Sequence, residues 1–170
     1  YKMIVKMRRN ESCSHERYEQ NVNIVYDPHA VELYLELMRR EAKEDFWSFC
    51  LYYDPLFFSG RSFLRGVANA FTRVYESYMA GIIRRLAVSM PPRAGKSYIS
   101  SLFIAWMLGK YPEESVMRNC CSARLYNKLS YDTRMIIRSG KYQAVFEGVV
   151  FRSDKQNLAG WSLEVARQVS

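Results

Sequence analysis

The stretch at 84–101 constrains the fold more than any other part of this 170-residue chain. It reads RRLAVSMPPRAGKSYISS, in which a short apolar run at 86–90 is followed by a loop that ends in Gly-Lys-Ser. An apolar pattern with helical spacing comes directly after the loop. Strand, tight loop and helix in this order are typical of a phosphate-binding loop, or P-loop. The sequence therefore predicts an anion site at the start of a helix.

The residues of this loop have the chemistry that a phosphate site needs. Backbone N–H groups of Ala94, Gly95 and Tyr98 are free of helical partners, and the helix dipole adds partial positive charge. Lys96 brings a full positive charge to the outer phosphates, and Ser97 offers a hydroxyl to Mg²⁺. Because only Gly-Lys-Ser matches the motif strictly, an exposed turn without function is the alternative. Met90 stands where the motif usually has a glycine.

The remaining sequence alternates between helical and strand patterns. From about residue 82 the order is β-loop-α-β-α-β-β, which favours a mostly parallel sheet with helices on both faces. We therefore expect an α/β protein of the P-loop NTPase type that forms an incomplete domain, with 1–80 as an N-terminal helical flank and 81–170 as the first part of the P-loop core. Helices are predicted at about 28–43, 44–53, 61–79, 96–109 and 123–139, and strands at 2–5, 86–90, 115–122, 149–152 and 161–165.

The net charge of +8, from 25 basic and 17 acidic residues, suits a polyanionic partner such as nucleic acid. A scattered solvated surface is the alternative. No apolar run approaches the length of a membrane span, and the basic start lacks the apolar stretch of a signal peptide. The first residue is Tyr1, which indicates a fragment. The candidate basic residues for a nucleic-acid surface are Arg84, Arg85, Arg118, Arg124, Lys128, Arg134 and Lys141.

The cysteines and histidines carry little functional signal. Four cysteines contain no CxxC pair, so we expect reduced thiols and no structural zinc site. The two histidines have no nucleophile or carboxylate nearby in the sequence, and we expect both at the surface. These residues are Cys13, Cys50, Cys120, Cys121, His15 and His29.

The segment at 90–97, MPPRAGKS, resembles the deviant Walker A motif of the large terminase subunits of tailed bacteriophages. In that family Pro-Pro-Arg often precedes Gly-Lys-Ser, and the leading glycine is commonly missing. The segments at 121–125 and 130–134 resemble the strand and helix that follow the P-loop in these ATPases. The likeness extends through 146–149 and Trp161, and it covers about residues 80–165.

The resemblance implies an ATPase motor that drives double-stranded DNA into a viral procapsid. It implies ATP and Mg²⁺ as cofactors, Arg93 and Lys96 as catalytic residues and Ser97 as the metal ligand. The portal protein and the small terminase subunit are the implied partners, in a homo-oligomeric ring that we expect to be a pentamer, with no membrane contact. The implied location is the host cell cytoplasm, at the procapsid portal vertex. The implied nucleotide-binding residues are Pro92, Arg93, Ala94, Gly95, Lys96, Ser97 and Tyr98.

Two parts of such a nucleotide site are not defined by the motif. In the family, residues upstream of the P-loop help to hold the base of the nucleotide. The aromatic and cationic residues at the corresponding place in this chain could do so, or they could belong to the hydrophobic core. These candidates are Phe57, Phe58, Arg61 and Phe63.

The catalytic acid is also missing from the pattern. Glu147, Asp154 and Glu164 follow the loop, and none of them ends an apolar run of the Walker B kind. We therefore expect a chain truncated before Walker B that binds nucleotide and hydrolyses it very poorly. The alternatives are a helicase-like or repair ATPase, a small-molecule kinase, and a non-enzymatic helical scaffold with a chance Gly-Lys-Ser turn.

Overall fold

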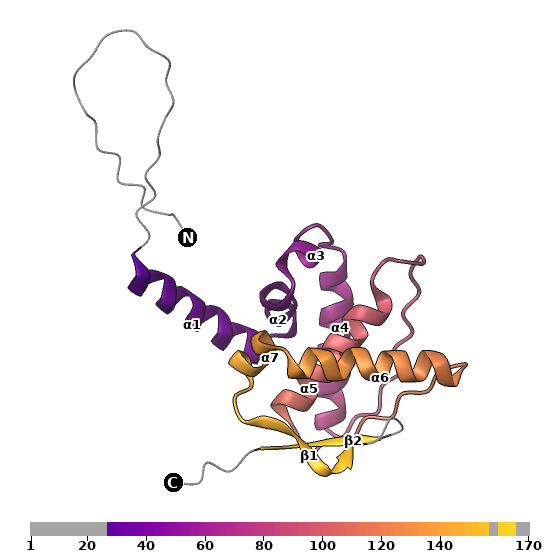
Figure 1. The fold of residues 1–170 in the computed structure, drawn as a ribbon. Helices are drawn as coiled ribbons and strands as arrows, with labels where there is room; N and C mark the ends of the chain where they lie inside the picture. The colour runs from indigo at the N-terminus through magenta and orange to yellow at the C-terminus, as the bar shows by residue number, and fades with distance from the viewer. Residues whose placement is uncertain (1–26, 157–159, 166–170) are drawn as a thin grey trace, which may run out of the picture.

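The structure is a computed structural model that describes residues 27–156 and 160–165, without the side chains of 154–156. The described part consists of seven helices and one antiparallel pair of strands (Figure 1). The elements are α1 (Pro28–Glu44), α2 (Phe46–Tyr53), α3 (Pro55–Ser59), α4 (Leu64–Met79), α5 (Lys96–Lys110), α6 (Ala123–Arg138), α7 (Gly140–Val145), β1 (Val149–Gln156) and β2 (Trp161–Val165).

This helical architecture shows that the predicted P-loop NTPase-type parallel sheet is wrong. The segments at 82–91 and 114–120 are neither helix nor strand, although both were predicted to contain strands. A parallel strand is stabilised by neighbouring strands and by cover on both faces. The described residues give these segments no such cover, because Ile83 is 91% exposed and Met117 is 86% exposed. The apolar patterns are present, and the strand partners that they require are not among the described elements.

Helix α5 lies at the centre of the molecule. The predicted apolar face is confirmed, since Ile99, Leu102 and Trp106 are all buried. Further buried residues on its other sides, including Ala105 and Leu108, make it apolar almost all round, as expected for a helix packed by several neighbours. Helices α2, α4 and α6 pack against it.

The same core draws residues from both sides of position 80. Phe46 and Phe49 of α2 belong to one hydrophobic cluster with Leu102 of α5 and Tyr142 of α7. The ring of Phe46 lies 5.7 Å from that of Trp106, and the indole Nε1 of Trp106 donates to the carbonyl oxygen of Ala42 at 2.9 Å. The division of the chain at residue 80 stays a prediction, and the packing joins the two parts through this cluster.

Aspartate and serine side chains start five of the helices. Asp27 accepts a hydrogen bond from the N–H of His29, so the predicted start of the first helix is confirmed. Asp45 and Asp54 cap α2 and α3 in the same way. Ser122 and Ser139 accept from the first turns of α6 and α7. These short side chains satisfy N–H groups that a helix start leaves free.

Two glycines lie near the predicted helix ends at 109 and 139, and α5 and α6 end within one residue of these positions. Gly140 is the first residue of α7, a helix that was not predicted, as α3 was not. Gly109 lies inside α5, which ends one residue later. A Cβ atom at Gly109 would lie 2.5 Å from the Tyr142 hydroxyl oxygen and 2.6 Å from Cγ of Phe146. Glycine is therefore needed there for the close approach of α7.

Strands β1 and β2 form a hairpin that covers one end of α6. Their predicted positions are confirmed, and Val149 pairs with Val165 in antiparallel register. The indole Nε1 of Trp161 donates to the hydroxyl of Ser130 at 3.0 Å, which ties the hairpin to α6. The strand predicted at 2–5 lies outside the described residues.

Candidate nucleotide-binding loop

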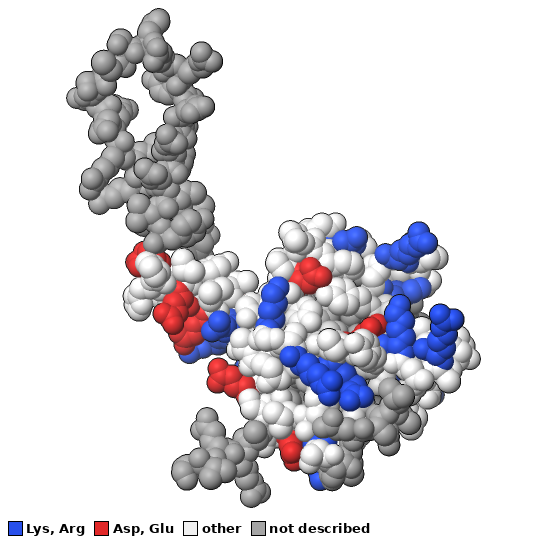
Figure 2. Space-filling view, viewed as in Figure 1, with Lys and Arg blue, Asp and Glu red and all other residues white. Residues whose placement is uncertain are grey.

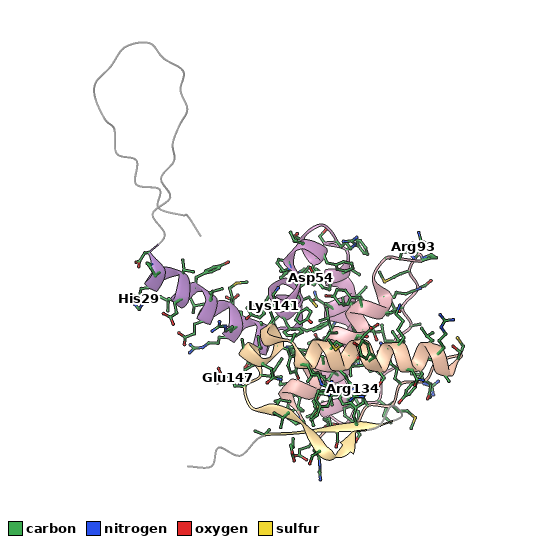
Figure 3. All side chains as sticks on the ribbon, in the orientation of Figure 1. His29, Asp54, Arg93, Arg134, Lys141 and Glu147 are labelled. Carbon is green, nitrogen blue, oxygen red and sulfur yellow. The ribbon has the colours of Figure 1, made fainter. Side chains whose placement is uncertain are left out.

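The predicted phosphate loop turns sharply between its prolines and α5. Arg93 has φ 62° and Gly95 has φ 98°, so two residues of the loop are in the left-handed region. Such a conformation is uncommon for a residue with a Cβ atom, and it tends to persist where the surrounding structure imposes it. The N–H of Ala94 faces the carbonyl oxygen of Pro91 at 3.4 Å, which closes a turn at 91–94. Figure 3 shows Arg93 at the tip of this loop, at the edge of the molecule.

The start of α5 is open to solvent. Its N-cap is Gly95, which has no side chain, and the structure gives this helix no side-chain capping bond. By contrast, a side chain caps each of five other helices in the described part. Lys96 and Ser97 occupy the first turn and are exposed. The N–H groups and the positive end of the dipole are therefore accessible to an anion at this point.

Lys96 spans the loop. Its Nζ donates to the carbonyl oxygen of Met90 at 2.8 Å, so the lysine joins the residue before the prolines to the first turn of α5. This contact places a full positive charge beside the uncapped helix start. The same hydrogen bond holds the backbone of Met90, the residue that replaces the usual glycine of the motif, against the start of α5.

An aromatic wall lies behind Gly95. A Cβ atom at Gly95 would lie 2.9 Å from Cζ of Phe57, so glycine allows the loop to pack directly on this ring. The guanidinium carbon of Arg61 lies 4.1 Å from the centre of the same ring, and its Nη1 donates to the carbonyl oxygen of Phe57. Tyr98 packs edge-on against Phe57, with ring centres 5.0 Å apart.

The four residues that the sequence suggested for binding the nucleotide base lie in three different environments. Phe58 is fully buried and belongs to the core. Phe63 is exposed and is the N-cap residue of α4. Phe57 lies against the Gly95 position of the loop and Arg61 lies over its ring, so this pair is the part of the set found beside the loop.

Asp54 is a residue at this site that sequence reasoning missed. Its Oδ1 accepts from the N–H of Phe57 at 3.1 Å, and its Oδ2 accepts from the Tyr98 hydroxyl at 3.0 Å. Burial and the bond to Asp54 raise the pKa of Tyr98 above its usual range. Asp54 therefore links α3 to the first turn of α5 and is a positioning residue. Asp54 precedes Pro55, and an aspartate directly before a proline is a capping signal that could have pointed to this helix start.

The acids that follow the loop in sequence are not brought to it. Glu147 is exposed at the far side of the molecule from Arg93 in Figure 3, and Glu164 is exposed on β2. The side chain of Asp154 lies outside the described part. Within the described residues, no group of three or more His, Cys, Asp or Glu side chains is arranged to hold a metal ion. The residue that fits Mg²⁺ is Ser97, whose hydroxyl would complete a coordination shell made mainly by phosphate and water oxygens.

The basic candidates are also placed differently from one another. Arg84 and Arg85 are exposed in the irregular segment before the loop. Arg118 is half-buried, where it donates to the hydroxyls of Ser100 at 2.9 Å and Ser101 at 3.0 Å. Desolvation by burial lowers its pKa. Arg118 therefore anchors its segment on α5 and is not free to form part of an exposed basic surface.

We expect the replacement of Gly95 by alanine to weaken nucleotide binding. The alanine would have to adopt φ 98° and place its Cβ against Phe57, a strain of about 1–3 kcal/mol that opens the loop. The matched control is Gly81→Ala, because Gly81 also has a positive φ but has open space around its Cβ position. Titration of both variants with a nucleotide should show a loss of affinity for the first alone. Equal affinities would contradict a role for the loop conformation.

A comparison of the chain with protein families, curated proteins and solved structures finds no match. The function must therefore be argued from the loop and its surroundings. Across the described ranges, no helix is both long and apolar enough to cross a membrane. Cys50 is a buried free thiol, and Cys120 and Cys121 are free as expected, whereas Cys13 and His15 lie outside the described residues.

Proposed function

We propose that this chain is the ATP-binding part of a viral DNA-packaging motor of the large terminase type. The observation that carries the proposal is the start of α5, where Gly95, Lys96 and Ser97 form an exposed, uncapped first turn after a left-handed loop. Backbone N–H groups, a lysine and a hydroxyl at one helix start are the combination that binds a Mg²⁺-bound triphosphate. The resemblance of MPPRAGKS to the terminase motif supplies the biological setting.

The roles of the residues follow from their positions. The N–H groups from Gly95 to Tyr98 hold the β-phosphate, whereas the N–H of Ala94 is bonded to Pro91. The ammonium of Lys96 exchanges its bond to Met90 for phosphate oxygens. The Ser97 hydroxyl would hold Mg²⁺, and the ion would supply positive charge that neutralises the triphosphate. Arg93 at the loop tip reaches the γ-phosphate. Pro92 and Ala94 shape the loop, and Tyr98 holds the helix start against Asp54.

The remaining features of the motor belong to the same proposal. They are translocation of double-stranded DNA, assembly as a pentameric ring with the portal protein and the small terminase subunit, and a location at the procapsid vertex in the host cytoplasm. Hydrolysis requires a group that orients water, and the described acid at this site, Asp54, already accepts from the Phe57 N–H and the Tyr98 hydroxyl. We therefore expect slow turnover from this chain.

The helical core favours one alternative, a non-enzymatic scaffold in which Gly-Lys-Ser is an exposed turn. A titration with a fluorescent ATP analogue in the presence of Mg²⁺ separates the two functions. The proposal expects saturable binding that ADP and ATP displace and that AMP displaces poorly, because the loop contacts the outer phosphates. Binding that is absent, or displaced equally by AMP, supports the scaffold.

A further inference from the structure

Helix α6 carries a basic stripe along its exposed side. Positions 124, 128, 131, 135 and 138 recur at the spacing of one helical face, and all five residues are exposed. We call Arg124, Lys128, Tyr131, Met135 and Arg138 the α6 stripe. Figure 2 shows Lys and Arg side chains gathered over this helix, in the same view as Figure 1.

The cations of the stripe are not neutralised by neighbouring acids. The ion pair found among the described residues joins Lys110 to Glu44, away from this helix. Asp132 is the single acid of α6, and it is half-buried and acts electrostatically on Arg118. Uncompensated cations on one face attract a polyanion and raise its local concentration.

Two contacts hold the far end of the stripe in place. The guanidinium carbon of Arg138 lies 5.1 Å from the centre of the Phe151 ring, a cation–π contact that leaves its N–H groups free for other partners. Beyond the helix, Lys141 is exposed and donates to the carbonyl oxygen of Tyr53 at 2.7 Å. Lys141 is not part of the stripe, whereas the contact with Phe151 orients Arg138 before any partner arrives, which lowers the entropy that binding would cost.

The spacing of the cations suits a nucleic-acid duplex. Arg124 and Lys128 form one group and Arg138 forms the other, with ten residues, or about 15 Å of helix, between Lys128 and Arg138. The major groove of B-DNA is about 12 Å wide between its phosphate edges, which long side chains at this separation can reach from one helix. Tyr131 and Met135 lie between the two groups and offer no bidentate base contact, so sequence preference should be weak.

We propose that the α6 stripe is a sequence-independent contact for the phosphate backbone of double-stranded DNA. This contact adds a DNA-binding surface to the proposed motor, and its use in translocation rests on that proposed function. It assigns the contact to Arg124, Lys128 and Arg138, and it excludes Arg118, whose guanidinium is held by two serines. Arg134 is also excluded, because its side chain is half-buried and its Nε is buried, whereas Arg138 is exposed.

The test is fluorescence anisotropy of the full chain with a labelled duplex of arbitrary sequence, measured between about 50 and 200 mM salt. The variant Arg124→Gln/Lys128→Gln/Arg138→Gln removes the stripe cations. The control Arg39→Gln/Arg40→Gln/Arg73→Gln removes the same charge from exposed positions on α1 and α4. We expect the affinity of the stripe variant for the duplex to fall by about tenfold or more at low salt. The magnitude of the slope of log K against log salt should fall by about 2 to 3, because three phosphate contacts are removed. The control should stay close to the original chain.

Several results would overturn the inference. Equal losses in both triple variants would mean that net charge alone drives binding. Tighter binding of a single strand than of the duplex, with loss on Tyr131→Ala, would assign the stripe to base stacking instead. The nucleotide titration shows whether the DNA contact or the proposed ATP site has failed. The stripe variant should bind the ATP analogue normally, whereas a chain that binds DNA through the stripe but no nucleotide would contradict only the ATP site.

Discussion

Replacing Lys96 with alanine is expected to abolish measurable binding of an ATP analogue. The change removes the ammonium beside the uncapped start of α5, together with its bond to the Met90 carbonyl oxygen. A hydrogen bond to a charged group contributes about 1.5–3 kcal/mol, so affinity should fall by about ten- to a hundredfold or more. If the original chain binds the ATP analogue weakly, this loss would place saturation of the site beyond the concentrations that the titration can reach. The measurement is the fluorescence titration, followed by displacement with unlabelled ATP.

The control for Lys96 is a lysine of the same helix with another partner. Lys110 pairs with Glu44 at the opposite end of α5, so Lys110→Ala removes the same charge away from the loop. We expect Lys110→Ala to bind nucleotide like the original chain. Both variants should stay folded by circular dichroism, because Lys96 is exposed and surface ion pairs contribute little to stability. Unchanged nucleotide affinity in Lys96→Ala would reject the phosphate loop.

Replacing Gly109 with alanine is expected to destabilise the whole molecule. The new Cβ would meet Tyr142 at 2.5 Å and the Phe146 ring at 2.6 Å and 2.7 Å. Neither residue can move freely, because both are buried and the Tyr142 hydroxyl donates to the carbonyl oxygen of Ala105 at 2.9 Å. Overpacking of this kind costs about 1–3 kcal/mol, and α7 must shift to relieve it. Thermal unfolding should show a midpoint lowered by about 4–10 °C.

Gly66 provides the matched control for this effect. It also lies inside a helix, α4, and a Cβ added there meets nothing within 4 Å. Gly66→Ala should stabilise the chain by about 0.5–1 kcal/mol, since alanine has the higher helix propensity. The two substitutions are chemically identical and should shift the midpoint in opposite directions. A lowered midpoint in both, or in neither, would contradict the close packing of α7 on α5.

Local signals predicted the helices well. Asp27-Pro28 marked the start of α1, and the spacing of Ile99, Leu102 and Trp106 marked the buried face of α5. These signals succeed because a cap or an apolar face acts within a few residues along the chain. The short helices were harder, since Gly140 starts α7 where its residue type suggested a stop.

The candidate site divides in a similar way. The sequence alone identified Gly95, Lys96 and Ser97, because the chemistry of a phosphate loop is carried by neighbouring residues. It did not predict the left-handed φ of Arg93 or the contact of Phe57 with Gly95. It also gave no sign that Asp54 binds Tyr98, 44 positions further along the chain. Contacts between residues so far apart depend on how α3 packs beside α5.

The sequence by itself determined where the five longer helices and the loop lie, and which residues of the loop we propose to meet a phosphate. Only the tertiary structure decided the architecture. The runs at 86–90 and 115–122 were predicted as strands, like those at 149–152 and 161–165. A strand exists only where another strand hydrogen-bonds to it. In the described part that pairing is realised only between β1 and β2. Helices complete their backbone hydrogen bonds within themselves, so the longer ones could be predicted from the chain, whereas the pairing of strands into a sheet could not.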